Sequence, residues 1–256
     1  MEFKTLRKAV AIGVLAVTSG YATQASAAPI FTFTEWGGFS VDVSPAIVTY
    51  SGPVVGPAAL VPAATPLFNT MSWVTALSPQ SSLNLSTVTG PAALPFATWT
   101  TISTLTHNNI VIPSPSSWGP QDVWGRFIVT DSSGPATVRL DSDDAITISF
   151  VETPNAGCAP PNPNGSVCDD YFTFTAIGLN SLPFTANDGT NWLAEFRFGN
   201  LINAVQVGDS IFTAEEVSSK LDVQVRVSQV PEPATLSLLG LGLIGLGVAK
   251  RRQLKG

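Results

Sequence analysis

The single histidine of the chain, His107, is the first residue whose chemistry could indicate an activity. It lies in the segment Leu105–Ile110, where threonine and asparagine side chains can satisfy backbone groups at the end of a strand. We favour that structural role. A hydrolase that pairs His107 with a serine and an aspartate is one alternative, and a metal site shared with carboxylates is another. A zinc site with two histidines is excluded, because there is no second histidine.

Two acidic clusters offer oxygen ligands of the kind that Ca²⁺ prefers. Asp141, Asp143 and Asp144 precede a predicted strand and are the first candidates, although they do not match an EF-hand loop. Asp169 and Asp170 are a second candidate pair. A solvated loop is the alternative for both, and paired carboxylates could also serve glycoside hydrolysis. Ca²⁺ is the one cofactor that the residues suggest, and no catalytic residue is assigned.

Two further residue types point to structure or binding. Trp118 lies in a loop rich in proline, serine and glycine, where an exposed ring could stack on a sugar. Cys158 and Cys168 are the two cysteines, and a turn-rich segment of nine residues separates them. In an exported protein this spacing predicts a disulfide that closes a hairpin loop, with a metal pair as the alternative.

The segments that must position these residues read as β-strands. Runs of alternating apolar and polar residues separated by turn signals predict an antiparallel β-sandwich, jelly-roll-like, with a barrel as the alternative. The expected strands cover 31–36, 98–105, 123–130, 145–151, 171–177, 192–198 and 221–227, whereas 51–66 and 113–120 are expected to be loops. We therefore expect an all-β domain over residues 28–229.

The two ends of the chain differ from this body in composition. Residues 1–27 combine a basic start, an apolar run and the sequence Ala25-Ser26-Ala27, which predicts a secretory signal peptide. Residues 230–256 contain Pro231-Glu232-Pro233, an apolar run over 234–249 and the basic residues Lys250, Arg251 and Arg252. This order predicts a transmembrane helix with a cytoplasmic C-terminus, so that the body lies outside the inner membrane.

This C-terminal segment resembles the PEP-CTERM sorting signal of Gram-negative bacteria. The resemblance implies that an exosortase, an integral-membrane enzyme, recognises Pro231, Glu232 and Pro233 and cuts nearby. It implies an inner-membrane-anchored precursor whose body is then released or transferred to the cell surface or an exopolysaccharide matrix. The residues of the signal would be recognised by the processing enzyme and would not be catalytic.

A second resemblance centres on the histidine. Thr106, His107 and Asn109 match the Thr-His-x-Asn signature of the THxN family of PEP-CTERM proteins, and Ser72-Trp73 and residues 80–83 are similar to the segments that precede it there. The family implies no assigned activity.

Charge narrows the possible functions. The stretch 28–229 holds five basic and sixteen acidic residues, which argues against nucleic-acid binding. We therefore expect a non-enzymatic surface or biofilm-matrix protein with a structural or adhesive role. A carbohydrate- or calcium-binding module and a secreted hydrolase are the alternatives.

Overall fold

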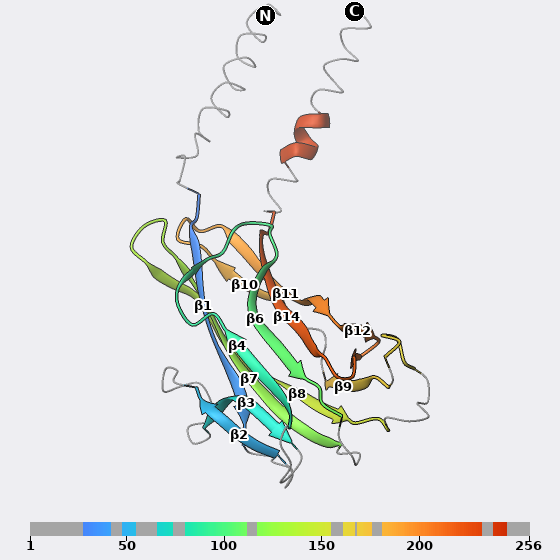
Figure 1. Cartoon of the computed structure of the whole chain (residues 1–256). Coiled ribbons are helices and arrows are strands. Elements are labelled where there is room, and N and C mark those ends of the chain that lie inside the picture. The colour runs from blue at the N-terminus through green and yellow to red at the C-terminus, as the bar shows by residue number, and fades with distance from the viewer. Residues whose placement is uncertain are drawn as a thin grey trace, which may run out of the picture.

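A computed structural model gives the structure of the chain, and nearly all of its regular structure is β-sheet (Figure 1). The described residues are 28–41, 48–54, 66–73, 80–111, 117–154, 161–166, 168–175, 181–231 and 238–244. Residues 1–27, which include the predicted signal peptide, lie outside these ranges. All seven strands expected from the alternating pattern are present, several of them longer than expected.

Fourteen strands are formed in the described part of the chain. They are β1 (Phe31–Ser40), β2 (Val48–Pro53), β3 (Leu67–Trp73), β4 (Ser81–Thr87), β5 (Ala92–Ala93), β6 (Thr100–Asn108), β7 (Trp118–Asp131), β8 (Thr137–Val151), β9 (Asp170–Thr175), β10 (Leu182–Thr185), β11 (Asn191–Ile202), β12 (Ala204–Val207), β13 (Ser210–Thr213) and β14 (Ser218–Gln229).

The strands join into one antiparallel sheet with the order β10-β11-β14-β6-β4-β3-β1-β7-β8-β9-β13-β12. β2 pairs with β3, and β5 pairs with β1. Along this order, the shortest pairing between neighbouring strands is that of β1 with β3, where only Phe39↔Phe68 and Ser40↔Leu67 are paired. We call this short pairing the seam. It joins a half that contains β14, β6, β4 and β3 to a half that contains β1, β7, β8 and β9.

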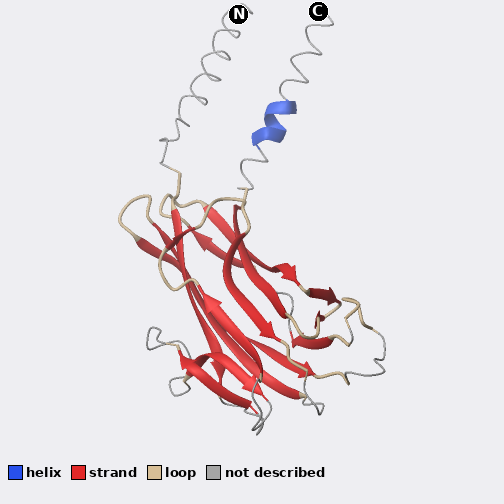
Figure 2. Ribbon diagram, in the orientation of Figure 1, coloured by secondary structure: helices blue, strands red, loops and turns tan. Residues whose placement is uncertain are grey.

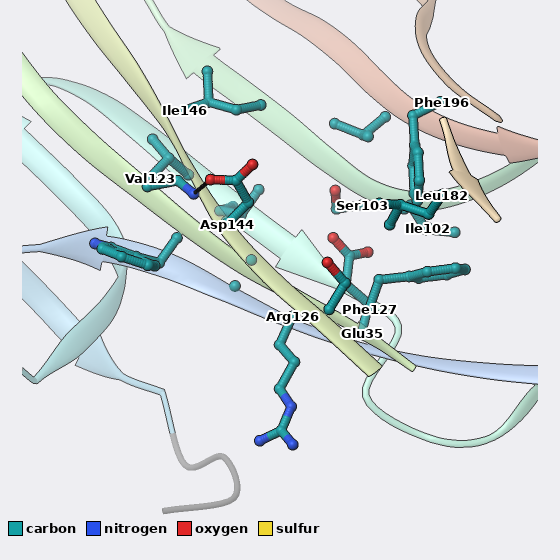
Figure 3. A pocket seen from close by; sticks show the side chains of 17 residues that line it. Glu35, Ile102, Ser103, Val123, Arg126, Phe127, Asp144, Ile146, Leu182 and Phe196 are labelled. Carbon is teal, nitrogen blue, oxygen red and sulfur yellow. Dashed lines mark hydrogen bonds between the residues drawn. The ribbon is translucent and has the colours of Figure 1, made fainter. Parts of the chain in front are cut away.

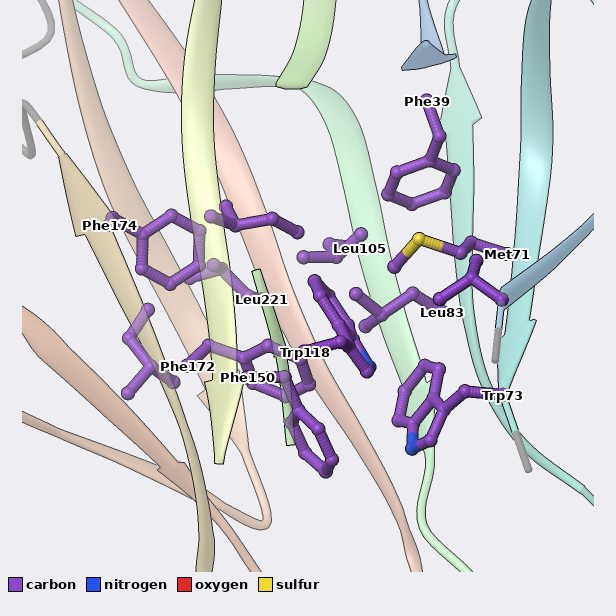
Figure 4. Close-up of a cluster of buried hydrophobic side chains, with 13 residues drawn as sticks. Phe39, Met71, Trp73, Leu83, Leu105, Trp118, Phe150, Phe172, Phe174 and Leu221 are labelled. Atoms are coloured by element: carbon purple, nitrogen blue, oxygen red, sulfur yellow. The ribbon is translucent and has the colours of Figure 1, made fainter. Parts of the chain in front are cut away.

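The sheet is curled (Figure 2). Apolar side chains from both halves meet inside it. Trp73 on β3 lies 4.7 Å from Phe150 on β8, measured between ring centroids, and Phe127 on β7 lies 5.2 Å from Phe196 on β11. Figure 4 shows the larger of two buried clusters, which is rich in aromatic rings. The antiparallel all-β prediction is therefore confirmed, while its jelly-roll detail stays a prediction.

The first strand in the chain, β1, begins at the same end of the molecule at which the last strand, β14, ends (Figure 1). The ring of Phe31, at the start of β1, lies 5.0 Å from that of Trp192, which pairs with Gln229 at the end of β14. Residues 238–244 beyond β14 form a short helix with exposed leucines. None of the helices in the described ranges has the length and apolar character needed to cross a bilayer.

Candidate functional site

His107 lies near the end of β6, between two neighbouring strands. It pairs with Leu83 of β4 on one side and with Ser219 of β14 on the other. Side chains alternate across a strand, so His107 points into the interior while Thr106 and Asn108 point the other way. Only 2% of the His107 side chain is exposed.

Aromatic rings surround His107 inside the sheet. Trp73 stacks on it at 5.5 Å with an interplanar angle of 20°, and the edges of Phe150 and Phe172 approach at 5.7 and 4.9 Å. Burial among these rings lowers the pKa of His107 to about 3, because a charged imidazolium would lose its hydration there. The imidazole is therefore neutral near pH 7.

One hydrogen-bonded chain connects His107 to the start of β9. Its Nδ1 lies 3.0 Å from Oγ1 of Thr213, and that hydroxyl donates to the backbone carbonyl of Asp170 at 3.4 Å. Since the Thr213 hydrogen is used towards Asp170, Nδ1 of His107 is the donor to Thr213, which leaves Nε2 as a buried acceptor without a partner. His107 thus supports the residues around Asp170.

Three buried carboxylates, one of them that of Asp170, lie close together. Glu152 follows β8, Asp170 begins β9, and Glu215 lies in the turn between β13 and β14. Their exposed fractions are 3%, 0% and 6%, and one oxygen from each lies within 4.8 Å of the others. We call these three residues the acidic triad. Within the described ranges, no other such group of three acidic, histidine or cysteine side chains is found.

Burial raises the pKa of all three carboxyl groups. For Glu152 and Glu215 the next cause is the charge of neighbouring carboxylates, that of Asp170 above all, whereas for Asp170 hydrogen bonds from Thr153 and Asn109 oppose the rise. Asp170 Oδ1 accepts the Thr153 backbone N–H at 2.8 Å, while Oδ2 has no partner. Three unneutralised charges at this spacing in the interior are costly, so the triad needs protons or a cation.

Asn109, the last residue of the Thr-His-x-Asn match, lies beside the triad. Its backbone N–H donates to the Val217 carbonyl at 3.4 Å, and its Nδ2 donates to the Ala214 carbonyl at 3.3 Å. Both acceptors flank Glu215 in the β13–β14 turn. The structure therefore brings His107 and Asn109 to one site, whereas Thr106 is half-buried on the other face of β6.

Asp141, Asp143 and Asp144, the first calcium candidates from the sequence, are not part of the one close group of three such side chains found in the described ranges. Asp141, Asp143 and Asp144 are exposed along β8, where successive side chains point to opposite faces. Asp141 accepts two hydrogen bonds of 2.6 Å from Arg126, and this guanidinium lowers the pKa of Asp141. The run that looked like a turn is a strand paired with β7, and the calcium role of these aspartates stays a prediction.

Trp118 was expected in an exposed loop, and this is wrong. It is the first residue of β7, only 5% exposed, and its ring stacks on Phe150 at 5.5 Å. A sugar cannot reach a ring in this position, so the sugar-binding role assigned to Trp118 falls with its exposure.

A cavity of about 210 Å³ lies between the two halves of the sheet (Figure 3). Its walls are mainly apolar, from residues such as Leu85, Ile102 and Phe196, and Glu35 points into it. Burial raises the pKa of Glu35 to about 8, although a hydrogen bond with Ser103 opposes the rise. Glu35 Oε2 is buried without a partner. Sequence reasoning missed this acid, because it lies inside an ordinary strand pattern.

The remaining predicted sites are described only in part. Cys168 is fully buried and is not a free thiol. Cys158 lies outside the described residues, so its pairing with Cys168 stays a prediction. Of the sorting residues, Pro231 is described, directly beyond β14, while Glu232, Pro233, Lys250, Arg251 and Arg252 lie outside.

Comparison with known proteins identifies the segment that begins at the end of β14. Residues 229–252 match the PEP-CTERM protein-sorting motif. A comparison with curated proteins gave no match. The motif implies an exported protein that is anchored in the membrane and then cleaved by an exosortase, a membrane enzyme, for delivery to the cell surface. By this motif, the chain is an exosortase-sorted extracellular protein.

Proposed function

We propose that this protein is a non-enzymatic structural or adhesive component of the cell envelope or the exopolysaccharide matrix. The observation that carries the proposal is the position of the sorting motif, which starts at residue 229, the last residue of β14. An acidic, strand-rich body of residues 28–229 is then the cargo, and the motif is its address.

The proposal includes the finer expectations from the sequence. A signal peptide over residues 1–27 exports the chain, and an apolar helix over 234–249 holds the precursor in the inner membrane. A disulfide between Cys158 and Cys168 closes the loop between β8 and β9. We also assign the protein to the THxN family on the resemblance of Thr106, His107 and Asn109 to its signature.

The environment of His107 argues against the hydrolase alternative. A general base must reach a substrate and have a pKa near the working pH. His107, the only histidine of the chain, is 2% exposed among aromatic rings, and its pKa is lowered to about 3. Its contacts instead support a structural role in holding the strand ends together.

The sorting step can be tested by replacing Pro231-Glu232-Pro233 with alanines and following the protein in cell fractions. We expect wild-type protein, shortened, at the cell surface or in the medium, and the variant as an uncut precursor in the membrane fraction. Pro135→Ala, an exposed proline in the β7–β8 turn, is the matched control and should behave as wild type. Equal distribution of all three proteins would remove the sorting assignment.

The structural role needs a separate measurement. A deletion strain should form a matrix with weaker cohesion or show weaker cell attachment, and wild-type protein should restore it. Unchanged cohesion and attachment in the deletion strain, together with turnover of a polysaccharide or ester by the purified protein, would contradict the proposal.

A further inference from the structure

We propose that Glu152, Asp170 and Glu215, together with Asn109, form a Ca²⁺-binding site that fastens the strand ends farthest from the sorting motif. The inference does not rest on the structural or adhesive role proposed above.

The spacing of the triad suits calcium. Ca²⁺ binds oxygen ligands at about 2.3–2.6 Å, so two ligands on opposite sides of one ion lie about 4.6–5.2 Å apart. The triad oxygens all lie within 4.8 Å of one another, which allows each of them to reach a common point. Mg²⁺ usually keeps several waters and uses one or two carboxylates, so a buried set of three carboxylates favours Ca²⁺.

A neutral side chain independently points to a ligand. The Oδ1 atom of Asn109 is buried and has no partner, although the residue is only 3% exposed and its Nδ2 is used by Ala214. A hydrogen bond from the Asn109 amide nitrogen lowers the pKa of Asp170, so the side chain reaches the triad, and a 180° turn of the amide would bring Oδ1 to the ion. An amide oxygen is a common calcium ligand, and an orphaned one beside three carboxylates is otherwise unexplained.

The triad oxygens are similarly short of donors. Both oxygens of Glu152, both of Glu215 and Oδ2 of Asp170 are buried and receive no hydrogen bond from another type of side chain, while Glu152 and Glu215 each lie within hydrogen-bonding reach of Asp170. Asp170 Oδ1 is held by Thr153, which fixes the carboxylate and leaves Oδ2 for the ion. Several oxygens from few residues can thus supply the six to eight ligands that Ca²⁺ takes, with water completing the set.

No basic side chain neutralises this cluster in the described part of the chain. The two ion pairs found there join Arg126 to Asp141 and Arg226 to Glu195, both elsewhere on the sheet. Buried carboxylates are normally paired with a cation or coordinate a metal. A divalent ion would supply the missing charge at this position.

The site would connect segments that are distant in sequence. Asn109 follows β6, Glu152 follows β8, Asp170 begins β9, and Glu215 precedes β14. These four segments come from both halves of the curled sheet, so a shared ion would hold the halves together. The site would also give a role to two of the Thr-His-x-Asn residues. Asn109 would be a ligand, and His107 would position β9 through Thr213.

The test uses the full-length chain, purified in mild detergent and treated with a chelator. Calorimetric titration with CaCl₂ should show one ion bound with a dissociation constant in the ~0.1–1 mM range of extracellular calcium modules. The same addition should raise the melting temperature, whereas MgCl₂ at equal concentration should not. Glu215→Gln and Asp170→Asn should each weaken Ca²⁺ binding at least tenfold.

Glu216→Gln is the matched control, because it makes the same change of charge at the exposed neighbouring residue of the same turn. It should bind Ca²⁺ as wild type does. Glu152→Gln serves if Glu215→Gln does not fold. A melting temperature that rises on acidification but is indifferent to Ca²⁺ would show a proton-sharing cluster and overturn the proposal. Equal effects of both cations, or binding that survives the triad substitutions, would also overturn it.

Discussion

Glu35 shows how strongly the interior of this sheet acts on a single carboxyl group. Burial beside the cavity raises the pKa of Glu35 from its ordinary value of 4.5 to about 8. The folded protein therefore retains a proton that the unfolded chain loses. The stability that follows is complete below pH ~4.5 and declines as the pH rises towards about 8.

Glu35→Gln should remove this pH dependence. The amide keeps a hydrogen-bonding group near Ser103 but cannot ionise. We expect wild-type protein to lose about 1.4 kcal/mol of stability per pH unit relative to the variant between pH ~4.5 and ~8. Urea denaturation of both proteins at several pH values in that window measures the difference. A difference that does not change with pH would contradict the assignment.

At the scale of single residues, the sequence indicated which residue types could carry a role better than it indicated what surrounds their side chains. His107 is buried, as the structural role favoured for it requires, but its hydrogen-bond partner is Thr213 and not a flanking threonine or asparagine, and the role itself stays a prediction. The acidic triad was not found, because Glu152, Asp170 and Glu215 lie in three separate connections that only the folded sheet brings together. Asp170 had been a calcium candidate, but with Asp169, whose carboxylate instead accepts hydrogen bonds from Asn164 and Ser166.

Among the elements, the seam between β1 and β3 is the shortest pairing in the strand order, with two paired residues on each strand. Gly38 lies beside it. A Cβ atom there would lie 2.9 Å from both the Leu67 Cβ and the Phe68 carbonyl oxygen, and 3.0 Å from Val54. Two of these atoms are fixed by the backbone of β3, so the neighbouring strand would have to move.

Gly38→Ala should therefore separate the seam and destabilise the fold by about 1–3 kcal/mol, the usual cost of overpacking. Gly134→Ala, in a turn where nothing lies within 4 Å of the new atom, is the matched control. Denaturant titrations of the two variants and the wild type measure the effect. Equal stability of Gly38→Ala and Gly134→Ala would show that the seam adapts freely.

Seven of the fourteen strands in the described part of the chain were predicted, because period-two alternation is a local property of the chain. The start of β8 was missed for a physical reason, since Asp141, Ser142, Asp143 and Asp144 have the composition of a turn. Pairing with β7 overrides that preference, and Arg126 satisfies Asp141 across the ladder. Trp118 was wrongly predicted to lie in a loop for a similar reason. Its neighbours are rich in proline and serine, as in a loop, although its ring packs in the core.

The order of strands in the whole sheet could not be predicted. Neighbours such as β14 and β6, or β1 and β7, are far apart in sequence, and no local pattern specifies which ladder forms. The sorting of the protein could be predicted, because the sorting motif lies within residues 229–252 alone. A short segment of sequence thus determines how the protein is sorted, whereas the order of its strands depends on pairing across the whole chain.

The position of β14 between two neighbouring strands has a mechanical consequence for a protein held at its C-terminal end. β14 is hydrogen-bonded to β11 on one side and to β6 on the other over most of its length. Tension between that anchor and the far end of the molecule would load both ladders in shear, so many bonds must break together. In single-molecule pulling, handles at Val230 and Val111 should give higher rupture forces than handles at Val230 and Pro29, which lie at the same end.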